Sequence, residues 1–223
     1  MSEQKKLIEY IDAEIKRDGQ EILHDINLTL YSGDFYTLEG PIGSGKTSLF
    51  KTFFADLPFT AQKAEVLDFN LLKLPARKIP KLRRRIGIVF QNYLLFDNKT
   101  VFDNLKFVTD SLNFKPNVGT ISDHIHSVLT KVGMDSKSET FPHMLSGGEK
   151  QSVAIARAIV CHPDIILADE PTGNLDENSA LHIASLLKSL ANEGAGVIAA
   201  THDENAFKNQ EHKILKIQNG TII

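Results

Sequence analysis

The stretch of sequence that decides the fold is Gly40-Pro41-Ile42-Gly43-Ser44-Gly45-Lys46-Thr47. It follows a short apolar run at residues 35–38, and a helical apolar pattern opens directly after it. Glycines let the backbone wrap around phosphate oxygens, while successive amides and a helix start supply positive potential. The lysine of such a loop reaches the terminal phosphates, and its hydroxyl residue ligates Mg²⁺. We therefore predict a phosphate-binding loop, with nucleotide contacts from Gly40, Pro41, Ile42, Gly43, Ser44, Gly45, Lys46, Thr47 and Ser48.

A glycine-rich turn that only caps a helix is the alternative explanation of this stretch. Two fixed glycines, a lysine and a hydroxyl residue make a chance match on the order of one in ten thousand positions or rarer. The strand before the loop and the helix after it reduce that chance further. The phosphate-binding interpretation is therefore preferred.

Four short, mostly apolar runs predict the central sheet. They cover residues 35–38, 86–90, 165–168 and 197–200, and such near-continuous hydrophobicity is typical of strands covered on both faces. Residues 179–192 show apolar positions at helical spacing. Strands that alternate with helices indicate an α/β fold with a parallel sheet.

Both ends of the chain carry signals for antiparallel pairing. Apolar residues alternate along residues 7–15 and 26–30, and Asp18-Gly19 is a turn signal between them. Asn219-Gly220 separates residues 214–218 from 221–223, as a tight hairpin requires. We expect an N-terminal antiparallel β subdomain and a closing hairpin.

Residues 92–148 lack such strands and predict an inserted helical lobe. Thr100-Val-Phe-Asp103 and Thr120-Ile-Ser-Asp123 each resemble a helix start, and Gly133 ends the second apolar pattern. We therefore expect a single domain, residues 1–223, whose core comprises residues 1–91 and 149–223. Some large apolar side chains after Gln91 should pack into the lobe, and the rest should form a groove for a helix of a partner. They belong to Tyr93, Leu94, Leu95, Phe96, Val101 and Phe102.

Polar residues stand where three of the predicted parallel strands end. They are Gln91, Asp169, Glu170 and His202. Because ligands bind beyond the carboxyl ends of strands in open α/β sheets, these side chains should meet the phosphate loop in one crevice. Gln91 alone would be an ordinary surface glutamine, and His202 alone an ordinary structural histidine. Together they predict a γ-phosphate site, in which Asp169 holds Mg²⁺ through water and Glu170 is the general base.

A second glycine-rich segment, Leu145-Ser146-Gly147-Gly148-Glu149-Lys150-Gln151, does not belong to that crevice. It precedes residues 153–160, where only Arg157 interrupts apolar and alanine residues, so it opens a largely buried helix. An ordinary glycine-softened helix start is the simplest explanation. Since helix N-termini also bind anions, the segment offers a second anion site in a protein with one phosphate loop.

These motifs together resemble the ABC-type ATPases. The signature LSGGEKQ of that family stands at residues 145–151, followed by Asp169-Glu170-Pro171-Thr172-Gly173-Asn174-Leu175-Asp176 and Thr201-His202-Asp203. The resemblance covers essentially the whole chain. It implies a P-loop NTPase fold of ABC type, hydrolysis of ATP to ADP and phosphate, and ATP and Mg²⁺ as ligands. It also implies a head-to-tail homodimer that forms on ATP binding.

The same resemblance implies roles for single residues. Ser146, Gly147, Gly148 and Gln151 of one subunit would meet the ATP held by the other subunit's phosphate loop. Asn174, Leu175 and Asp176 would form the loop that couples the two sites. Glu170, His202 and Gln91 would be the catalytic residues, and Thr47, Gln91 and Asp169 the metal-site residues, with Asp169 acting through water.

Within that family, residues 171–176 resemble the branch that contains the cell-division ATPase FtsE, the lipoprotein-releasing ATPase LolD and the efflux ATPase MacB. Residues 90–104 look most like the FtsE member. This implies a cytoplasmic subunit, peripheral on the inner face of the cell membrane, that drives an FtsX-like integral membrane protein in cell division. A LolD-like or MacB-like role in lipoprotein release or efflux is the alternative.

Composition limits the other classes of function. Lys and Arg number 25 against 28 Asp and Glu, a net charge of −3, so no nucleic-acid partner is expected. The single cysteine, Cys161, fits a reducing compartment, and no apolar run approaches the ~18 residues that cross a bilayer. A soluble ABC ATPase acting on nucleic acid or ribosomes is the rival, but the usual second ATPase half, coiled coil or zinc modules are absent from this sequence. A GTPase is disfavoured because no Asn/Thr-Lys-x-Asp sequence occurs.

Two positions depart from the family pattern. The family usually has an aromatic residue that stacks on adenine just before the first hairpin turn, whereas counting back from the phosphate loop places Ile15 or Lys16 there. Ser152 stands where an arginine is usual. The sequence therefore leaves open how the base is held.

Overall fold

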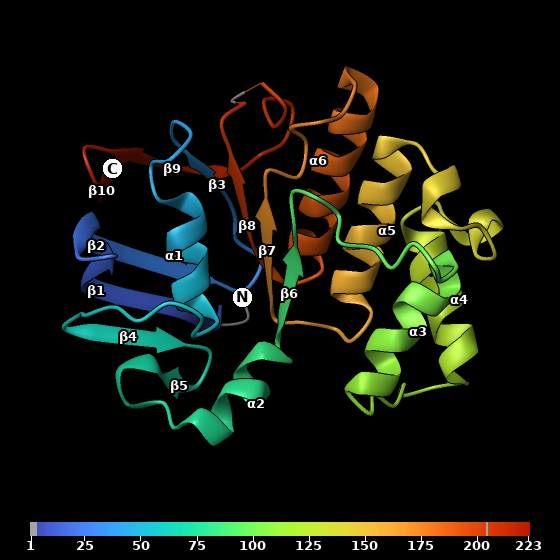
Figure 1. The fold of residues 1–223 in the computed structure, drawn as a ribbon, viewed down its shortest axis with the longest axis horizontal. Coiled ribbons are helices and arrows are strands. Elements are labelled where there is room, and N and C mark those ends of the chain that lie inside the picture. The colour runs from blue at the N-terminus through green and yellow to red at the C-terminus, as the bar shows by residue number, and fades with distance from the viewer. Residues whose placement is uncertain (1–3, 204) are drawn as a thin grey trace.

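The computed structural model describes residues 4–203 and 205–223, which form two sheets with helices around them (Figure 1). The strands are β1 Lys6–Arg17, β2 Gln20–Tyr31, β3 Phe35–Glu39, β4 Lys63–Val66, β5 Phe69–Asn70, β6 Ile86–Val89, β7 Ile165–Asp169, β8 Gly196–Thr201, β9 Lys213–Gln218 and β10 Thr221–Ile222. The α-helices are α1 Lys46–Phe53, α2 Ile79–Arg83, α3 Val101–Ser111, α4 Ile121–Lys131, α5 Gly147–Ile159 and α6 Glu177–Asn192.

The central sheet has the strand order β10-β9-β3-β8-β7-β6. Strands β3, β8, β7 and β6 run parallel, with Phe35 of β3 opposite Val197 of β8, and this confirms the predicted parallel sheet. Strand β9 also pairs in parallel with β3 before it turns through Asn219-Gly220 into β10. The sequence predicts that hairpin but not the pairing with β3, because a pairing between distant segments leaves no short-range signal.

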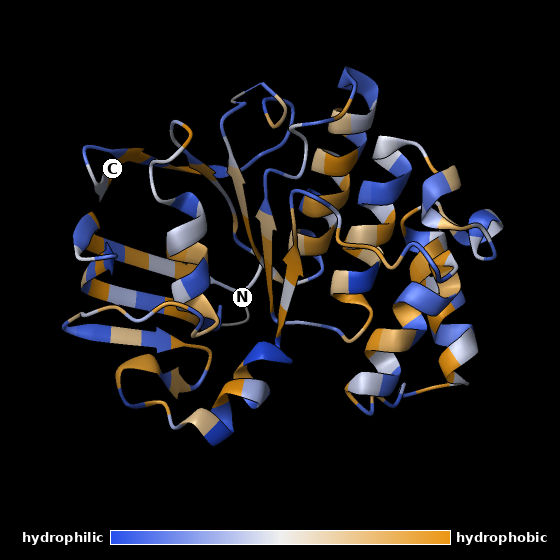
Figure 2. Ribbon diagram, viewed as in Figure 1, coloured by the Kyte–Doolittle hydropathy of each residue, from blue (hydrophilic) through white to orange (hydrophobic). Residues whose placement is uncertain are grey.

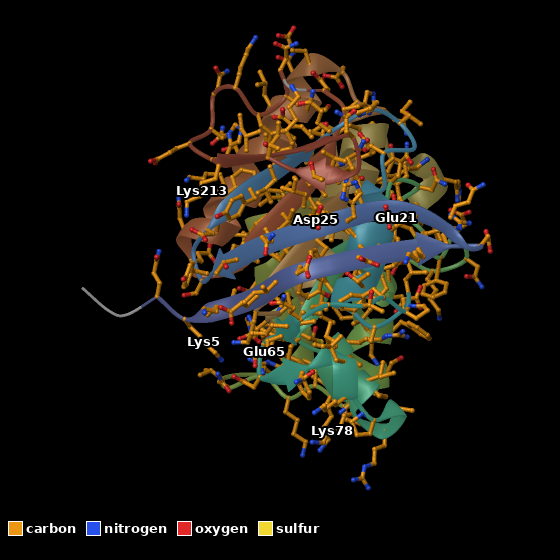
Figure 3. The ribbon with its side chains drawn as sticks, turned by 90° about the vertical axis from the view of Figure 1, so that its left-hand side faces the viewer. Lys5, Glu21, Asp25, Glu65, Lys78 and Lys213 are labelled. Atoms are coloured by element: carbon orange, nitrogen blue, oxygen red, sulfur yellow. The ribbon has the colours of Figure 1, made fainter. Side chains whose placement is uncertain are left out.

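A second, antiparallel sheet has the order β2-β1-β4-β5. Strands β1 and β2 meet at the predicted turn, where Asp18 and Gly19 have φ angles of 52° and 79°. The sequence does not predict β4 and β5, which span only four and two residues. Basic and acidic side chains both project from this sheet and its edges, with Lys5 and Glu65 near one end and Glu21 near the other (Figure 3).

Four helices begin at a side chain that caps them. Thr100, Thr120, Ser146 and Asp176 each accept a hydrogen bond from the backbone N–H three residues further on. These caps confirm the helix starts predicted at Thr100 and Thr120, and Gly133, with φ of 74°, follows the end of α4 as expected. None of the helices in the described part of the chain is both long and apolar enough to span a bilayer.

Two hydrophobic cores cover the two faces of the central sheet. One lies between the sheet, α5 and α6 and continues between α3 and α4, with Ile155 and Leu187 among its members. The other joins the sheet to α1 and the antiparallel sheet through residues such as Tyr10 and Phe53. Hydrophobic colours mark β6, β7 and the inward sides of α5 and α6 (Figure 2). Because α5 packs on α3 and α4 as well as on β6, the division into core and lobe at residue 149 stays a prediction.

Candidate functional site

The phosphate loop connects β3 to α1 at the carboxyl end of a parallel strand. Gly43 and Gly45 have φ angles of 83° and 104°, in the left-handed region that favours glycine. Gly45 also lies against β2, since a Cβ on it would stand 2.8 Å from Ile22 Cγ2. Helix α1 begins at Lys46, so its unpaired N–H groups start within the loop. These conditions explain why the loop is rich in glycine.

The loop forms one wall of a pocket of about 610 Å³. Its lining comprises Arg17, Gln20, Ile22, Ile42, Gly43, Ser44, Gly45, Lys46, Thr47, Ser48, Gln91, Asp169, Glu170 and His202. The polar residues at or just after the ends of β6, β7 and β8 are therefore brought together with the loop, because parallel strands end at the same edge of the sheet. Gly40 and Pro41 stand behind this lining and hold Lys46 with their carbonyls.

Three oxygen atoms surround the Lys46 ammonium group. Its Nζ donates to the carbonyls of Gly40 at 2.6 Å and Pro41 at 3.2 Å, and it lies 3.6 Å from Glu170 Oε1. The side chain is only 6% exposed, and these oxygens compensate the ammonium group for the water that burial removes. A terminal phosphate carries more negative charge than a carbonyl and would compete for the same donors.

Thr47 and Asp169 form a pair of oxygen donors beside the loop. The Thr47 hydroxyl donates to Asp169 Oδ2 at 2.8 Å. Burial raises the pKa of the Asp169 carboxyl, and the bond from Thr47 opposes that rise. Mg²⁺ prefers oxygen ligands and is usually held by one or two protein side chains together with substrate phosphates and water. A hydroxyl and a carboxylate in contact, with the Gln91 amide in the same pocket, fit that ion.

Glu170 adopts a strained backbone conformation beside His202. Its φ of 49° lies in the left-handed region, which costs a non-glycine residue roughly 1–2 kcal/mol. The Glu170 N–H donates to the carbonyl of Ala200 at 2.9 Å and helps to hold this conformation. The side chain is 10% exposed, with Oε2 2.8 Å from His202 Nδ1 and Oε1 facing Lys46. Strain at a buried carboxylate is typical of functional sites, and no feature of the sequence reveals it.

Two polar side chains fix the segment that follows Gln91. Arg157 of α5 donates to the carbonyl of Tyr93 at 2.7 Å and to that of Leu94, two residues with φ angles of 58° and 50°. Asn104 of α3 is fully buried, accepts one backbone N–H of this segment at 2.8 Å and donates to three of its carbonyls. Sequence reasoning assigned neither residue to the site. The signal for Arg157 is a charge inside an otherwise apolar helix.

The signature segment lies outside the lining of this pocket. A Cβ on Gly147 would stand 3.3 Å from Tyr93 Oη, and one on Gly148 would stand 2.6 Å from Ser179 Oγ. Both glycines therefore sit where other segments approach closely. Gln151 is buried, with its Nε2 lacking a hydrogen-bond partner among the described residues, while Ser146 caps α5.

The predicted coupling loop lies next to the signature. The Leu175 side chain would approach a Cβ on Gly147 to 3.5 Å, and the Asn174 carbonyl would approach it to 3.7 Å. Asp176 caps α6 through bonds from the Ser179 N–H and hydroxyl. The fold thus brings the signature and this loop together, and neither lines the phosphate pocket of its own chain.

The hairpin end of the pocket corrects one expectation. Ile15 is wholly buried and Lys16 pairs with a neighbouring glutamate at 3.1 Å, and neither lines the pocket. Arg17, Gln20 and Ile22 line it instead. The register of β1 is irregular on both sides of Ile15, and such bulges change which side chains face the pocket.

Known proteins match this chain in sequence and in structure. A family model described as ABC transporter matches residues 23–173. The cell division ATP-binding proteins FtsE of Streptococcus pneumoniae and Mycobacterium tuberculosis are 35% and 36% identical, over 97% of this chain and 94% and 93% of theirs.

Two solved structures are similar to the whole chain. The structure of CbiO1 from Clostridium perfringens, part of the ABC transporter complex CbiONQ, has a TM-score of 0.88 at 28% identity and covers 98% of this chain and 87% of its own. The dimeric bacterial ABC transporter cassette MJ0796 has a TM-score of 0.81 at 28% identity over 97% of this chain and 96% of its own. This α/β chain, with its phosphate loop and signature, belongs to the ABC transporter ATPase family.

Proposed function

We propose that this chain is the ATP-hydrolysing subunit of an FtsE-type ABC system, acting as a homodimer on an FtsX-like integral membrane protein in cell division. The observation that supports this chemistry is a single pocket that holds two groups of side chains. Glu170 contacts both Lys46 and His202, and Thr47 beside them is hydrogen-bonded to Asp169. Relatives named FtsE, matched over nearly the whole chain, support the biological role. In this proposal the subunit lies on the cytoplasmic face of the membrane, held there by its partner.

Each side chain of the pocket has a separable task. The loop amides and Lys46 bind the triphosphate and favour its negative charge. Thr47, Asp169 and Gln91 would hold Mg²⁺, which when bound supplies neutralisation of the phosphate oxygens. Glu170 accepts the proton of the attacking water, and its strained backbone aims the carboxylate before the nucleotide arrives.

His202 positions the base and the γ-phosphate. Its Nδ1 lies 2.8 Å from Glu170 Oε2, so the ring holds one carboxylate oxygen and leaves the other directed at Lys46. When a phosphate takes Lys46 from Glu170, that second oxygen becomes available to the water. The ion pair between Glu170 and Lys46 therefore keeps the base occupied until the nucleotide enters.

The pocket of one chain needs a second chain to be complete. The N-terminus of α5 with Ser146, Gly147 and Gly148 is a helix start suited to an anion, yet these residues do not line the phosphate pocket of the same chain. A head-to-tail pair places them against the γ-phosphate held by the partner. The similarity to a dimeric ABC cassette supports this arrangement. The loop at residues 174–176 approaches the signature closely, which supports its proposed role in coupling the two sites.

A groove of about 370 Å³ beside β6 suits the membrane partner. Strand β6 is the edge of the central sheet, and the groove lies between it and α3. Four large apolar side chains that line it are more than a third exposed, namely Phe90, Leu94, Phe96 and Phe107. Tyr93, Leu95 and Phe102 instead pack against the core. An amphipathic helix binds such a groove through its apolar face.

The groove is linked mechanically to the nucleotide pocket. Leu94 lines the groove, its carbonyl accepts a hydrogen bond from Arg157, and it lies three residues after Gln91 of the pocket. Arg157 belongs to α5, whose N-terminus is the signature. Movement of the signature toward a partner's phosphate would thus displace the wall of the groove, which is what a coupling element requires.

Single cysteines at Phe96 and Phe107, in a Cys161→Ser background, test the membrane partner. Cys161 also lines the groove, but burial raises the pKa of its thiol to about 11, so the background replaces a weakly reactive group. In native membranes both cysteines should crosslink to an integral protein, with yields that differ between ATP and ADP. Val118→Cys, at a residue that is 87% exposed and outside the groove, is the matched control.

Three outcomes of that experiment decide the role. Capture of an FtsX-like protein supports the proposal, whereas capture of a lipoprotein-releasing or efflux protein assigns the chain to that branch. If neither groove position captures a membrane protein above the Val118→Cys control, the membrane role is wrong. The purified chain should hydrolyse ATP whichever partner is captured. While most subunits are still monomers, its rate should rise as the square of the subunit concentration, because two chains complete each site.

A further inference from the structure

We propose that an exposed basic patch before β6 binds the anionic phospholipid headgroups of the membrane in which the partner protein lies. The inference rests on the proposed membrane role and adds a direct lipid contact to the contact with the partner. The basic patch consists of Lys73, Arg77, Lys78, Lys81 and Arg84.

Positive charge is concentrated in one segment of an acidic chain. Between Asp68 and Asp97 the sequence has no acidic residue, and its basic residues there are Lys73, Arg77, Lys78, Lys81, Arg83, Arg84 and Arg85. Because the whole chain carries −3 and these seven residues carry +7, the rest of the chain carries −10. The net charge of the chain therefore conceals a local surface that attracts anions.

Two of the seven basic side chains are used within the fold. Arg83 donates to the carbonyls of Phe54 and Ala55 at 2.9 and 3.1 Å. Arg85 donates to both carboxylate oxygens of Asp164, at 2.8 and 3.0 Å. The residues of the basic patch are all exposed, and their side chains make no ion pair or hydrogen bond within residues 4–203 and 205–223. Their charges are therefore available to an external partner.

The backbone holds the basic patch at the surface. Two 3₁₀ turns, Leu71–Lys73 and Ala76–Lys78, lead into α2, which is anchored by the fully buried Leu82. Lys78 lies at one end of the molecule, where side chains extend away from the body of the chain (Figure 3). Leu72 is 40% exposed and adds an apolar side chain to this surface. Basic and apolar side chains together suit the interface of an anionic membrane.

The basic patch is continuous with the groove proposed for the membrane partner. Arg84 lines that groove together with Phe90 and Phe107. A membrane protein whose helix occupies the groove therefore brings the basic patch close to the bilayer. The patch precedes β6, whereas Gln91 of the nucleotide pocket follows it, so a lipid contact leaves that pocket open to the second chain.

The charges favour lipid headgroups over a single acidic site. Clusters of about four to eight Lys and Arg residues bind anionic lipids, and each residue strengthens binding by about fivefold. A lysine carries a point charge on a flexible stem, which suits a fluid array of headgroups better than one fixed carboxylate. The acidic excess elsewhere in the chain does not cancel this attraction, because salt screens charges beyond about 10 Å.

Flotation of the full chain with lipid vesicles tests the inference. The chain should float with vesicles of equal parts phosphatidylglycerol and phosphatidylcholine, and not with vesicles of phosphatidylcholine alone. Binding should fall by about tenfold or more between about 0.1 and about 0.5 M salt, because the Debye length falls from about 10 Å to below about 5 Å. Lys78→Gln combined with Lys81→Gln should weaken binding by about 25-fold, the product of two fivefold losses.

Lys115→Gln combined with Lys208→Gln is the matched control, because it removes the same charge from two exposed lysines outside the basic patch. This variant should bind vesicles like the unmodified chain. Both double variants should hydrolyse ATP at the normal rate, since none of the four lysines lines the nucleotide pocket. The inference is wrong if the unmodified chain does not prefer anionic vesicles, or if the two double variants bind them equally.

The vesicles contain no protein, so their result is independent of crosslinking at Phe96 and Phe107. A chain that crosslinks to a membrane protein but ignores anionic vesicles refutes the lipid contact alone. A chain that binds the vesicles but captures no membrane protein refutes the proposed partner and keeps the lipid contact. If the chain ignores vesicles while Lys78→Gln with Lys81→Gln lowers crosslinking, the basic patch binds acidic residues of the partner protein, and the lipid contact is again refuted.

Discussion

Replacing Glu170 with glutamine separates the chemical step from nucleotide binding. The exchange keeps the volume of a side chain that is 10% exposed and keeps one oxygen for His202 Nδ1 at 2.8 Å. It removes the negative charge 3.6 Å from Lys46 Nζ and the proton acceptor for the attacking water. The variant should therefore fold, bind ATP and fail in hydrolysis.

The structure gives the magnitudes. Loss of a general base lowers the rate by about 10²–10⁴, and a thousandfold loss corresponds to about 4 kcal/mol in the activation barrier. At 3.6 Å and an effective dielectric constant of about 20, the gross attraction between Glu170 and Lys46 is about 4–5 kcal/mol, most of it offset by solvation. Freed from that attraction, Lys46 should bind phosphate more tightly by about 1 kcal/mol, or roughly fivefold.

Two measurements check these values. Steady-state phosphate release should fall by about 10³ in Glu170→Gln, while equilibrium titration should show ATP affinity equal to or above that of the unmodified chain. Sedimentation velocity should show a dimer with ATP that dissociates on exchange into ADP. Glu211→Gln, at an exposed glutamate outside the pocket lining, should behave like the unmodified chain. Turnover within threefold of normal in Glu170→Gln would remove Glu170 from the role of base.

Gly147→Asp should abolish turnover and ATP-dependent dimerisation, because the new carboxylate would repel the phosphate held by the partner. The monomer should keep its ATP affinity within about threefold. A collapse of monomer affinity would show that the signature binds the nucleotide of its own chain. Asp169→Asn should raise the melting temperature of the nucleotide-free chain at pH 7.5, because burial raises the pKa of Asp169. A carboxyl whose pKa is raised in the folded state destabilises the fold as pH rises from the ordinary carboxyl range through that raised pKa. The increase in melting temperature caused by Asp169→Asn should therefore shrink toward pH 4. Scanning calorimetry at pH 7.5 and at pH 4 checks the direction of this change. Arg157→Met removes the charged donor from the carbonyls of Tyr93 and Leu94 and should lower the free energy of unfolding by about 2–3 kcal/mol. An unchanged urea midpoint would show that these two hydrogen bonds do not stabilise the segment after Gln91.

Short-range features are what the sequence by itself determined. The phosphate loop is readable because its glycines, lysine and hydroxyl stand within eight consecutive residues. The helix starts at Thr100 and Thr120 are readable because a cap acts on a backbone N–H three residues away. The parallel strands are readable because strands covered on both faces are apolar at successive positions. The fold class and the identity of the polar residues at the strand ends followed from these local rules.

Tertiary structure alone decided which distant residues meet and how they are aimed. The left-handed backbone of Glu170 depends on a bond to Ala200 of a neighbouring strand. The segment after Gln91 is held by hydrogen bonds from Arg157, which is more than sixty residues away in sequence. At the hairpin end of the pocket, Arg17 lines the wall while Ile15 and Lys16 do not, and the pairing of β1 is irregular there. Residue spacing along a chain predicts facing side chains only while the strand register is regular, and only the folded chain shows where that register shifts.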